Sequence, residues 1–453
     1  MNSIQSTPSA TWWCRAILAI LLLYSLVHFA ESGVRVPLSR PSLGQIEEEV
    51  SPLRRHLRDG LPVTTNNPRQ YGPVFFFVMH PLLRVAADDP ERLSRLLYGL
   101  QIVCLSLSFV FSWAAFGPVV APERRWIALG GLAVLWANFA PIYMILAVKN
   151  VETWELLLIC AALYGYLRRS RAAAGIALAA AGLIKLLPLA LLSYFVVRDR
   201  RPLVYACAGM AIFLLAGQLL YGSQMGVRYL PSVARNANAW AITWHENISL
   251  KGMLAKQFGY LKNASTVLKH TSAEPLVYES ISGSEGYIVE LTPRQLTVVK
   301  WLGLAGQVIG GLWSLWLMLE TPGAPFAPHR VLWEWSLIVV MMLIFSPMTA
   351  FEYCALALPA FSYAFVRLLA GRPSPVGAWV SFAGAVLLVA NIAPRQVINR
   401  LFAIDALNRW TGYTHLTLSE GYQYYGFPFV GLILLVATLC LVREEPVRLL
   451  RSV

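Results

Sequence analysis

Apolar segments recur along this chain from one end to the other, and they constrain its fold more than any other feature. A helix needs about 20 mostly apolar residues to cross the roughly 30 Å of hydrocarbon in a bilayer. Of the 453 residues, 57% are hydrophobic and 13% are charged, and soluble domains usually have roughly 25% charged residues. We therefore expect an all-α integral membrane protein with a single polytopic domain over residues 1–453, and not a soluble fold, a disordered tail protein or a lone anchored ectodomain. The predicted segments, about twelve by the length criterion, run approximately over residues 16–30, 94–116, 126–146, 153–167, 172–184, 187–197, 202–221, 295–319, 331–345, 353–369, 376–393 and 425–442.

Two apolar segments need a separate decision. Residues 16–30 have the charged start and apolar middle of a signal peptide, but residues 27–30 lack the small-x-small pattern of a cleavage site. We predict an uncleaved first span. Residues 74–83 are too few to span a bilayer unaided, and we predict a re-entrant or interfacial segment there.

Basic residues set the predicted topology. Lys and Arg number 37 and Asp and Glu number 24, a net charge of +13. In a polytopic protein such an excess gathers in cytoplasmic loops, so it does not indicate a nucleic-acid partner. With the N-terminus inside, the Arg-rich turns at residues 123–125, 168–171 and 198–201 all face the cytoplasm. If residues 74–83 were a full span, every later turn would change sides.

Three long polar stretches then face outward. They are residues 31–93, with amphipathic and re-entrant segments, residues 222–294 and residues 394–424. A simple channel does not need one large face and one face of short turns. This asymmetry favours an enzyme at the outer leaflet, with an outward-facing cavity formed by the long loops.

A lysine lies at a break between two short apolar segments. Residues 172–184 and 187–197 meet at Lys185, close to Pro188. We predict a helical hairpin whose break borders protein or a wet cavity, because lipid does not tolerate non-helical backbone. A Lys among apolar helices costs about 2.5–3.5 kcal/mol unless it faces a cavity or a partner. Lys185 is therefore expected either to hold a phosphate or diphosphate or to form a structural ion pair.

An amphipathic helix is predicted in the first outer loop. In one interpretation Ser51 is the N-cap, Pro52 is the first helical residue and Gly60 is the stop. In the other, Pro52 lies inside a longer helix with a single apolar stripe. The stripe consists of Ile46, Val50, Leu53 and Leu57.

The same loop contains three successive acidic residues, Glu47, Glu48 and Glu49. One hypothesis is that one of these carboxylates is a general base that accepts the proton of an acceptor hydroxyl. The alternative is a solvated amphipathic helix on the membrane surface.

Other candidate residues are polar side chains near the ends of apolar segments. Glu152 and Glu155 lie on one helical face at the start of a span, and interfacial solvation is a sufficient explanation for Glu152 but not for Glu155. Arginines in the last outer loop suit an anionic lipid phosphate or ordinary headgroup contact. The candidates for binding are Tyr71, Lys149, Asn150, Asn247, Ser249, Glu352, Tyr353, Arg395 and Arg400.

Several function classes lack their motifs in this sequence. The chain has no H-E-x-x-H, no Walker loop and no G-x-G-x-x-G, which argues against ATP-driven transport and dinucleotide chemistry. Its six Cys lie in or beside apolar runs without a C-x-x-C pair, so we expect small buried hydrophobes. No metal ligand set and no cofactor is predicted.

Five motifs follow one another along the chain. They are the acidic loop from Glu47 to Gly60 with the entry Tyr71-Gly72-Pro73, the pair Lys149-Asn150, the Gly-rich helix from Gly175 to Lys185 and Pro188, the segment Asn247 to Gly252, and the pair Ser346-Pro347. In this order they resemble glycosyltransferase family 87 of the GT-C superfamily, which includes polyprenol-phosphate-mannose-dependent mannosyltransferases. The resemblance covers most of the chain, and it depends on the order of the motifs and their side of the membrane.

The resemblance implies a GT-C fold and a polyprenyl phosphate that carries one sugar, mannose or another hexose or pentose, as the donor. In a multi-pass protein of the bacterial inner or plasma membrane, the donor headgroup would lie in the outer cavity. Glu47, Glu48 or Glu49 would deprotonate a lipid or glycan acceptor, and attack would invert the anomeric carbon. Lys185 and an Arg of the last loop would stabilise the departing phosphate.

The sequence also departs from the family. Glu stands where the family commonly has Asp, and an alignment on Val50 and Gly60 favours Glu47 as the matching position. Many relatives have aromatic and His residues where this chain has residues 350–353, and Lys149 replaces a small polar residue. These differences concern sugar and acceptor specificity. Two other classes stay open: a lipid or sugar transporter, which would typically have paired broken helices, and a non-catalytic subunit of an envelope-assembly complex.

Overall fold

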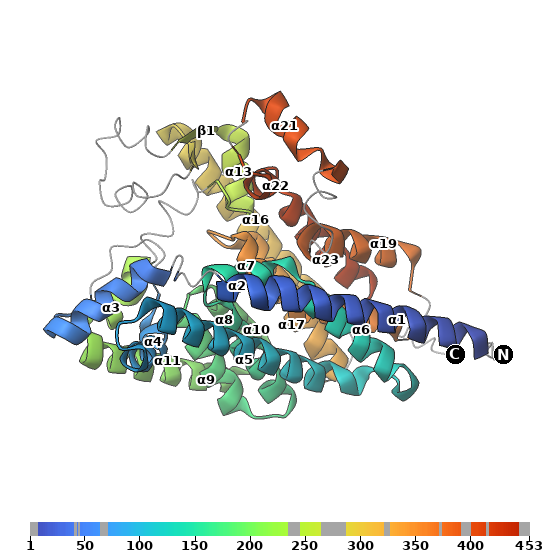
Figure 1. Ribbon diagram of the computed structural model, residues 1–453, viewed down its shortest axis with the longest axis horizontal. Coiled ribbons are helices and arrows are strands. Elements are labelled where there is room, and N and C mark those ends of the chain that lie inside the picture. Colours follow the sequence, from blue (N-terminus) through green and yellow to red (C-terminus); the bar gives the residue numbers. More distant parts are fainter. Residues whose placement is uncertain are drawn as a thin grey trace.

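The computed structural model describes residues 8–39, 43, 46–63, 71–233, 245–263, 287–320, 327–370, 374–390, 400–413 and 416–443. Nearly all of the regular structure in these residues is helical, with one small antiparallel sheet (Figure 1). The first elements are α1 (Pro8–His28), a π-helix (Phe29–Arg35), α2 (Val36–Ser39), α3 (Glu47–Asp59), α4 (Pro73–Ala86), α5 (Pro90–Phe116), α6 (Arg125–Ala137), α7 (Ala140–Val148), α8 (Glu152–Leu167), α9 (Arg171–Gly182), the 3₁₀ helix η5 (Leu187–Leu191), α10 (Leu192–Arg198) and α11 (Arg200–Tyr221). The later elements are α13 (Leu250–Phe258), β1 (Tyr260–Asn263), β2 (Tyr287–Glu290), α16 (Pro293–Glu320), α17 (Pro328–Phe345), the 3₁₀ helix η7 (Phe351–Ala357), α18 (Leu358–Leu369), α19 (Val376–Ala385), a π-helix (Val386–Ala390), α21 (Ile404–Thr411), α22 (Leu418–Tyr424) and α23 (Phe427–Leu441).

Six helical stretches of the described residues are long and apolar enough to cross a membrane, or up to eight if each of two bent pairs is one span. The six are Arg15–Ser39, Pro90–Val119, Arg200–Tyr221, Pro293–Glu320, Pro328–Phe345 and Phe351–Leu369. The multi-pass all-α membrane class is therefore supported, whereas the number of about twelve spans expected from segment length is not confirmed. Shorter apolar helices occupy three more of the predicted spans, Arg171–Gly182, Leu187–Arg198 and Val376–Ala390, and a fourth, Pro73–Ala86, occupies the segment predicted to be re-entrant or interfacial. The predicted span 153–167 corresponds to the 16-residue helix α8.

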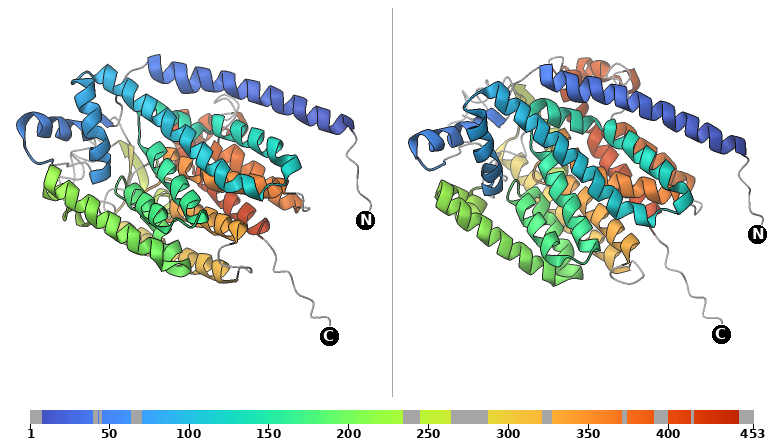
Figure 2. Two further views of the ribbon diagram at one scale, coloured as in Figure 1. Left: turned by 90° about the horizontal axis from the view of Figure 1, so that it is seen from below. Right: turned by 60° about the horizontal axis from the view of Figure 1, so that its bottom comes forward.

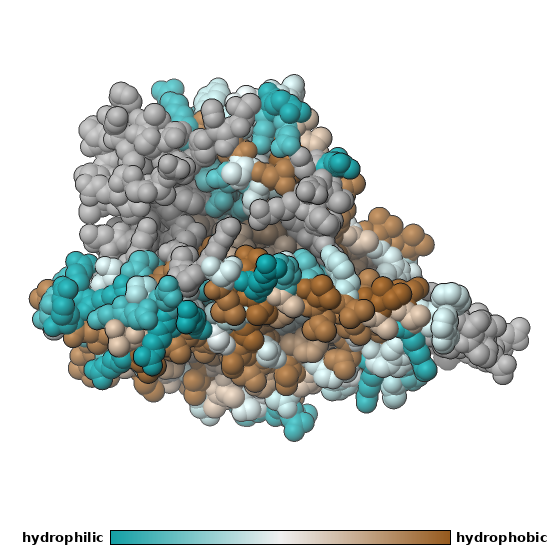
Figure 3. Space-filling view, in the orientation of Figure 1, coloured by the Kyte–Doolittle hydropathy of each residue, from teal (hydrophilic) through white to brown (hydrophobic). Residues whose placement is uncertain are grey.

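The helices differ in how far protein covers them. Helices α11 and α16 expose large apolar side chains such as Leu219 and Trp301, whereas α17 and α18 are almost entirely buried. Figure 3 shows apolar residues in a broad band across the helical body. Exposed apolar surface of this extent is unfavourable in water and favourable in lipid. We therefore assign α11 and α16 to the lipid-facing surface and α17 and α18 to the protein core.

The first-loop helix follows the second of the two interpretations. Helix α3 begins at Glu47 and contains Pro52, so the prediction of Ser51 as its N-cap is wrong. The apolar stripe of Ile46, Val50 and Leu53 is fully buried, and this burial outweighs the local preference of Pro for a helix start. Gly60 has a left-handed φ of 66° and ends the helix as expected.

One predicted span is bent. The segment 126–146 consists of α6 and α7, which meet at 45°. Helix α7 has Pro141 in its first turn, which cannot donate the main-chain hydrogen bond that would continue α6. Helices α22 and α23 meet at 51°, and this bend lies at the expected boundary between the last outer loop and the last span.

The short apolar segment after Tyr71 forms α4, one of the shorter helices. It packs against α3, α5 and α11 at one end of the body (Figure 2). A shared core contains α3, α4, the end of α9 and α11, through residues such as Val50, Phe75, Leu183 and Tyr221. The first loop is therefore anchored to the same unit as the predicted break at Lys185.

Elements of the other two predicted outer loops lie together on one side of the helical body, where Figure 1 shows α13, β1, α21 and α22. An apolar cluster joins them, with Ala255 of α13, Val289 of β2, Leu416, and Tyr424 of α22. The segments 222–294 and 394–424 therefore pack against each other. Their outward position in the membrane stays a prediction.

Candidate active site

Two turns that are distant in sequence meet at the break after α9. The Gly72 N–H donates to the Ile184 carbonyl at 2.9 Å, and the Val74 N–H donates to the Leu183 carbonyl at 3.3 Å. A Cβ atom at position 72 would lie 2.1 Å from the Leu183 oxygen, so only glycine allows this approach. The motif at residues 71–73 and the broken hairpin therefore form one structural unit.

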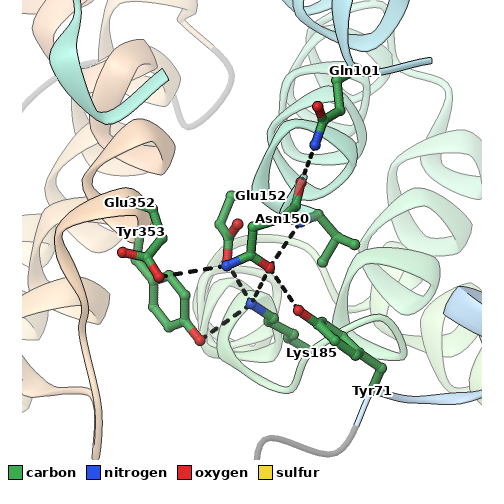
Figure 4. Close-up of polar contacts among 8 residues, drawn as sticks. Tyr71, Gln101, Asn150, Glu152, Lys185, Glu352 and Tyr353 are labelled. Atoms are coloured by element: carbon green, nitrogen blue, oxygen red, sulfur yellow. Dashed lines mark hydrogen bonds and ion pairs between the residues drawn. The ribbon is translucent and has the colours of Figure 1, made fainter. Parts of the chain in front are cut away.

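Lys185 lies at this break and is 7% exposed. Its Nζ forms an ion pair with the buried carboxylate of Glu152, the first residue of α8. It also donates to Tyr353 Oη at 3.2 Å and to Asn150 Oδ1 at 3.4 Å (Figure 4). The ring centroids of Tyr353 and Tyr71 lie 4.5 and 5.0 Å from Nζ, a cation–π geometry. A buried charge is stable when it is paired in this way.

Asn150 joins the surrounding segments. Its Oδ1 accepts a hydrogen bond from Tyr71 Oη at 2.6 Å, and its Nδ2 donates to Glu352 Oε1 at 3.5 Å. Its main-chain carbonyl accepts from Gln101 Nε2 of α5 at 2.6 Å. Because Asn150 lies between α7 and α8, this carbonyl is free of helical hydrogen bonding. One connected cluster thus contains five predicted binding residues, Tyr71, Asn150, Lys185, Glu352 and Tyr353 (Figure 4).

Two carboxylate oxygens of α8 accept no hydrogen bond from the part of the chain that the structure describes. Glu152 Oε2 and Glu155 Oε1 are buried, and neither has a hydrogen-bond partner among the described residues. Buried carboxylate oxygens are nearly always satisfied by protein, water or a ligand. The site can therefore accept hydrogen bonds from hydroxyl groups that the protein itself does not supply.

Lys149 is next to Asn150 in sequence but its ammonium group contacts different partners. Its backbone is left-handed, with φ 58°, and it ends α7. The buried Nζ donates to the carbonyl oxygens of Leu146 at 2.9 Å and Pro37 at 3.3 Å. A cation suits the C-terminal carbonyls of a helix, and these contacts explain Lys149 as the residue that stabilises the turn before Asn150.

The segment from Asn247 to Gly252 begins α13 and packs on the Ser-Pro motif. Asn247 Oδ1 accepts from Ser249 N at 2.9 Å and from Thr349 N at 3.0 Å, and its Nδ2 donates to the Pro347 carbonyl at 3.0 Å. Ser249 caps α13 by accepting from Gly252 N at 3.3 Å. Two motifs of the predicted resemblance are therefore in direct contact, and they hold the chain just before η7, which carries Glu352 and Tyr353.

Two predicted residues of the first and last loops, Glu47 and Arg400, take no part in the contacts described above. Glu47 is half-exposed and pairs with Arg54 of the same helix. Glu48 and Glu49 belong to α3 by their backbone, but their side chains and the whole of Arg395 lie outside the described residues. Arg400 is exposed. A role for any of them in binding or catalysis stays a prediction.

Glu152 and Gln101 were not predicted to be parts of this site. Glu152 was explained by interfacial solvation, yet it is 0% exposed and pairs with Lys185. The available signal was the presence of Lys185 itself, because a buried Lys requires a carboxylate partner within reach. Gln101 lies in the middle of a long apolar helix and gave no signal beyond its polarity.

One comparison with known proteins agrees with the resemblance. Residues 70–278 match the model of glycosyltransferase family 87. The matched segment contains Tyr71, Asn150, Lys185 and the Asn247 motif, and it ends before Glu352. A comparison with curated proteins finds no match. The expected resemblance is thus confirmed over residues 70–278, a segment that does not include Glu47 or the pair Ser346-Pro347, and it supports a membrane glycosyltransferase.

Proposed function

We propose that this chain, a membrane glycosyltransferase that resembles family 87, transfers one sugar from a polyprenyl-phosphate donor to a lipid or glycan acceptor on the outer side of the cell membrane. The sugar is mannose or another hexose or pentose. The bond between the anomeric carbon and the phosphate oxygen breaks, and a bond to the acceptor oxygen forms with inversion. The acceptor proton passes to an enzyme carboxylate, and the polyprenyl phosphate leaves.

The observation that carries the proposal is the buried ammonium group of Lys185 at the helix break, beside Tyr71 and Tyr353. The donor phosphate bears one negative charge, and the departing polyprenyl phosphate bears about two. A fixed cation therefore stabilises the developing charge more than it stabilises the bound donor, and that difference is what accelerates the reaction.

Phosphate binding would change the contacts of Lys185. An ammonium group has three protons, and they point to Glu152, Asn150 and Tyr353. The contacts to Asn150 and Tyr353 are longer than the ion pair with Glu152. A phosphate oxygen would replace one of these two, while Glu152 keeps the ammonium group at the break.

A groove next to the hairpin suits the polyprenyl chain. It lies between α10, α16 and α17, has a volume of about 350 Å³, and starts at Ala190, shortly after Lys185 on the same hairpin. Its lining is mainly apolar or small, including Val197, Gly310, Met318, Ile338, Met341 and Phe345. An isoprenoid chain has no hydrogen-bonding groups and requires such a lining. Headgroup and chain would thus occupy adjoining parts of the protein.

The unsatisfied oxygens of Glu152 and Glu155 suit the sugar. Each hydroxyl of a hexose or pentose can donate one hydrogen bond, and these buried carboxylates accept none at these atoms from the described residues. Sugar hydroxyls placed between Lys185 and α8 would supply the missing donors.

The general base is proposed to be a first-loop carboxylate, with Glu47 favoured over Glu48 and Glu49. Helix α3 is anchored through Val50 and Leu53 to the core that contains Tyr71 and Ile184. Its N-terminal acids are therefore attached to the same unit as Lys185. Glu352 is a second carboxylate in the cluster, and the two assignments give different mutational results.

A transfer assay with the purified protein tests the proposal. Incubation with synthetic polyprenyl-phosphate mannose, other hexoses and pentoses, together with a panel of lipid and glycan acceptors, should give a product of increased mass with at least one pair. Lys185→Met should raise the KM for the donor about tenfold or more, while Lys300→Met, an exposed Lys of α16, should not. Fluorescent lipid that crosses a liposome membrane without any change in mass, with no transfer in the panel, would instead indicate a transporter.

A further inference from the structure

Three potential metal ligands meet where the two predicted outer loops pack together. His245 and Glu246 precede α13, and Glu420 lies in the first turn of α22. One imidazole nitrogen and one oxygen from each carboxylate lie within 4.8 Å of one another. No metal ligand set is predicted from the sequence, because Glu420 is far from the other two residues along the chain.

The spacing of one pair fits a shared ion better than a hydrogen bond. His245 Nε2 lies 3.7 Å from Glu420 Oε1, whereas an N–H···O hydrogen bond spans about 2.7–3.2 Å. Two ligands that each lie about 2.0–2.2 Å from one ion are roughly 3.0–3.6 Å apart. A small inward movement of either side chain would therefore give the separation of two ligands of one ion.

Neighbouring groups orient both carboxylates. Glu420 Oε2 accepts from the Thr417 N–H at 2.8 Å in a capping box, which directs Oε1 toward His245. Glu246 Oε1 is 3.5 Å from Gln423 Nε2, one turn further along α22. Hydrogen bonds of this kind fix the orientation of ligands in metal sites.

One buried cation lies beside the cluster. Lys256 donates its Nζ to the Gln423 carbonyl at 3.0 Å and faces the ring of Tyr424 at 5.5 Å. His245 is 2% exposed. The two carboxylates attract a divalent cation, and burial strengthens this attraction.

We propose that His245, Glu246 and Glu420 bind one divalent transition-metal ion, Zn²⁺ or Mn²⁺. One imidazole nitrogen with carboxylate oxygens suits these ions, whereas Mg²⁺ and Ca²⁺ prefer oxygen ligands alone. The ion joins the turn before α13 to α22. Since the ring of Tyr422 in α22 packs on that of Phe351 at 6.3 Å, the ion also holds α22 against η7, the segment that carries Glu352.

Direct metal binding tests this proposal independently of any transferase activity. The full chain is purified without a polyhistidine tag, stripped with a chelator and titrated with Mn²⁺, and free Mn²⁺ is measured by electron paramagnetic resonance. We expect about one saturable site per chain, competition by Zn²⁺, and a higher unfolding temperature of the loaded protein. Glu246→Gln, Glu420→Gln and His245→Asn should each weaken binding at least about tenfold.

Glu91→Gln is the matched control, because Glu91 is an exposed carboxylate of α5 that pairs with Arg95. It should leave Mn²⁺ affinity unchanged. Equal affinities of Glu420→Gln and Glu91→Gln would show an adventitious ion only and would overturn the proposal. If the ligand variants fail to fold, the stripped wild-type protein decides alone, since the lack of a saturable Mn²⁺ site there would equally overturn it.

Discussion

Lys185 and Glu152 form a buried ion pair between the break after α9 and the first residue of α8. Both side chains are at least nine-tenths buried. The pair therefore fixes a charge inside the helical body, and each partner depends on the other for its stability.

Removing only the carboxylate should be more harmful than removing both charges. Glu152→Gln leaves the ammonium group of Lys185 buried without its carboxylate partner, and we expect the free energy of unfolding to fall by about 3–5 kcal/mol. Glu152→Gln/Lys185→Met should recover much of this loss, because no unpaired charge remains. Thermal unfolding in detergent, followed by tryptophan fluorescence, measures both variants. A double variant no more stable than the single one would contradict this account of the pair.

The double variant also separates folding from function. If Lys185 holds the donor phosphate, Glu152→Gln/Lys185→Met should fold and yet bind polyprenyl-phosphate sugar at least about tenfold more weakly than Lys300→Met, as expected when one charged contact is lost. A labelled donor and a filter-binding assay measure this. Unchanged donor binding would leave Lys185 with only its structural role.

Gly72 should tolerate no side chain. Gly72→Ala would place a Cβ atom 2.1 Å from the Leu183 carbonyl oxygen, so residues 71–73 must move away from the break after α9. We expect the free energy of unfolding to fall by about 1–3 kcal/mol or more, as in other overpacked sites. Gly99→Ala in α5 is the control, because an added Cβ there meets nothing within 4 Å. That variant should be neutral or stabilised by up to about 1 kcal/mol. Unfolding temperatures of the two variants give the comparison.

Asn247 should contribute more to stability than the cap residue that follows it. Asn247→Ala removes hydrogen bonds to Ser249, Pro347 and Thr349 and leaves buried groups unpaired. We expect this to lower the free energy of unfolding by about 1–3 kcal/mol. Ser249→Ala removes mainly the cap of α13, about 1 kcal/mol. Limited proteolysis should cut the Asn247 variant faster. Equal resistance of the two variants would show that contact with the Ser-Pro motif adds little.

The activities of four Glu→Gln variants identify the general base. If Glu47 accepts the acceptor proton, Glu47→Gln should lower kcat by about 10²–10⁴ with little change in the KM for the donor. Glu48→Gln and Glu49→Gln should then keep most of the activity. A large loss in Glu352→Gln with normal activity of all three first-loop variants would move the role of base to Glu352. Rates from the transfer assay with the preferred donor provide the test.

Local sequence patterns predicted individual helices well where one face of the helix is buried. The stripe of Ile46, Val50 and Leu53 supported the longer of two forms of α3, which is the form observed, and Gly60 predicted its end. The hydropathy pattern missed the bend before α7. Hydropathy sums over a segment, whereas this bend depends on one main-chain donor that Pro141 lacks.

The sequence by itself determined that this is a helical membrane protein, because segments this apolar and this free of charge are stable only when lipid or protein surrounds them. It also located Lys185 at a break. Only the tertiary structure decided that Glu152 is its partner, that Gly72 lies against Leu183 and that Glu420 meets His245. These pairs join segments far apart in the chain, and their contact depends on how whole helices pack, which no local pattern records.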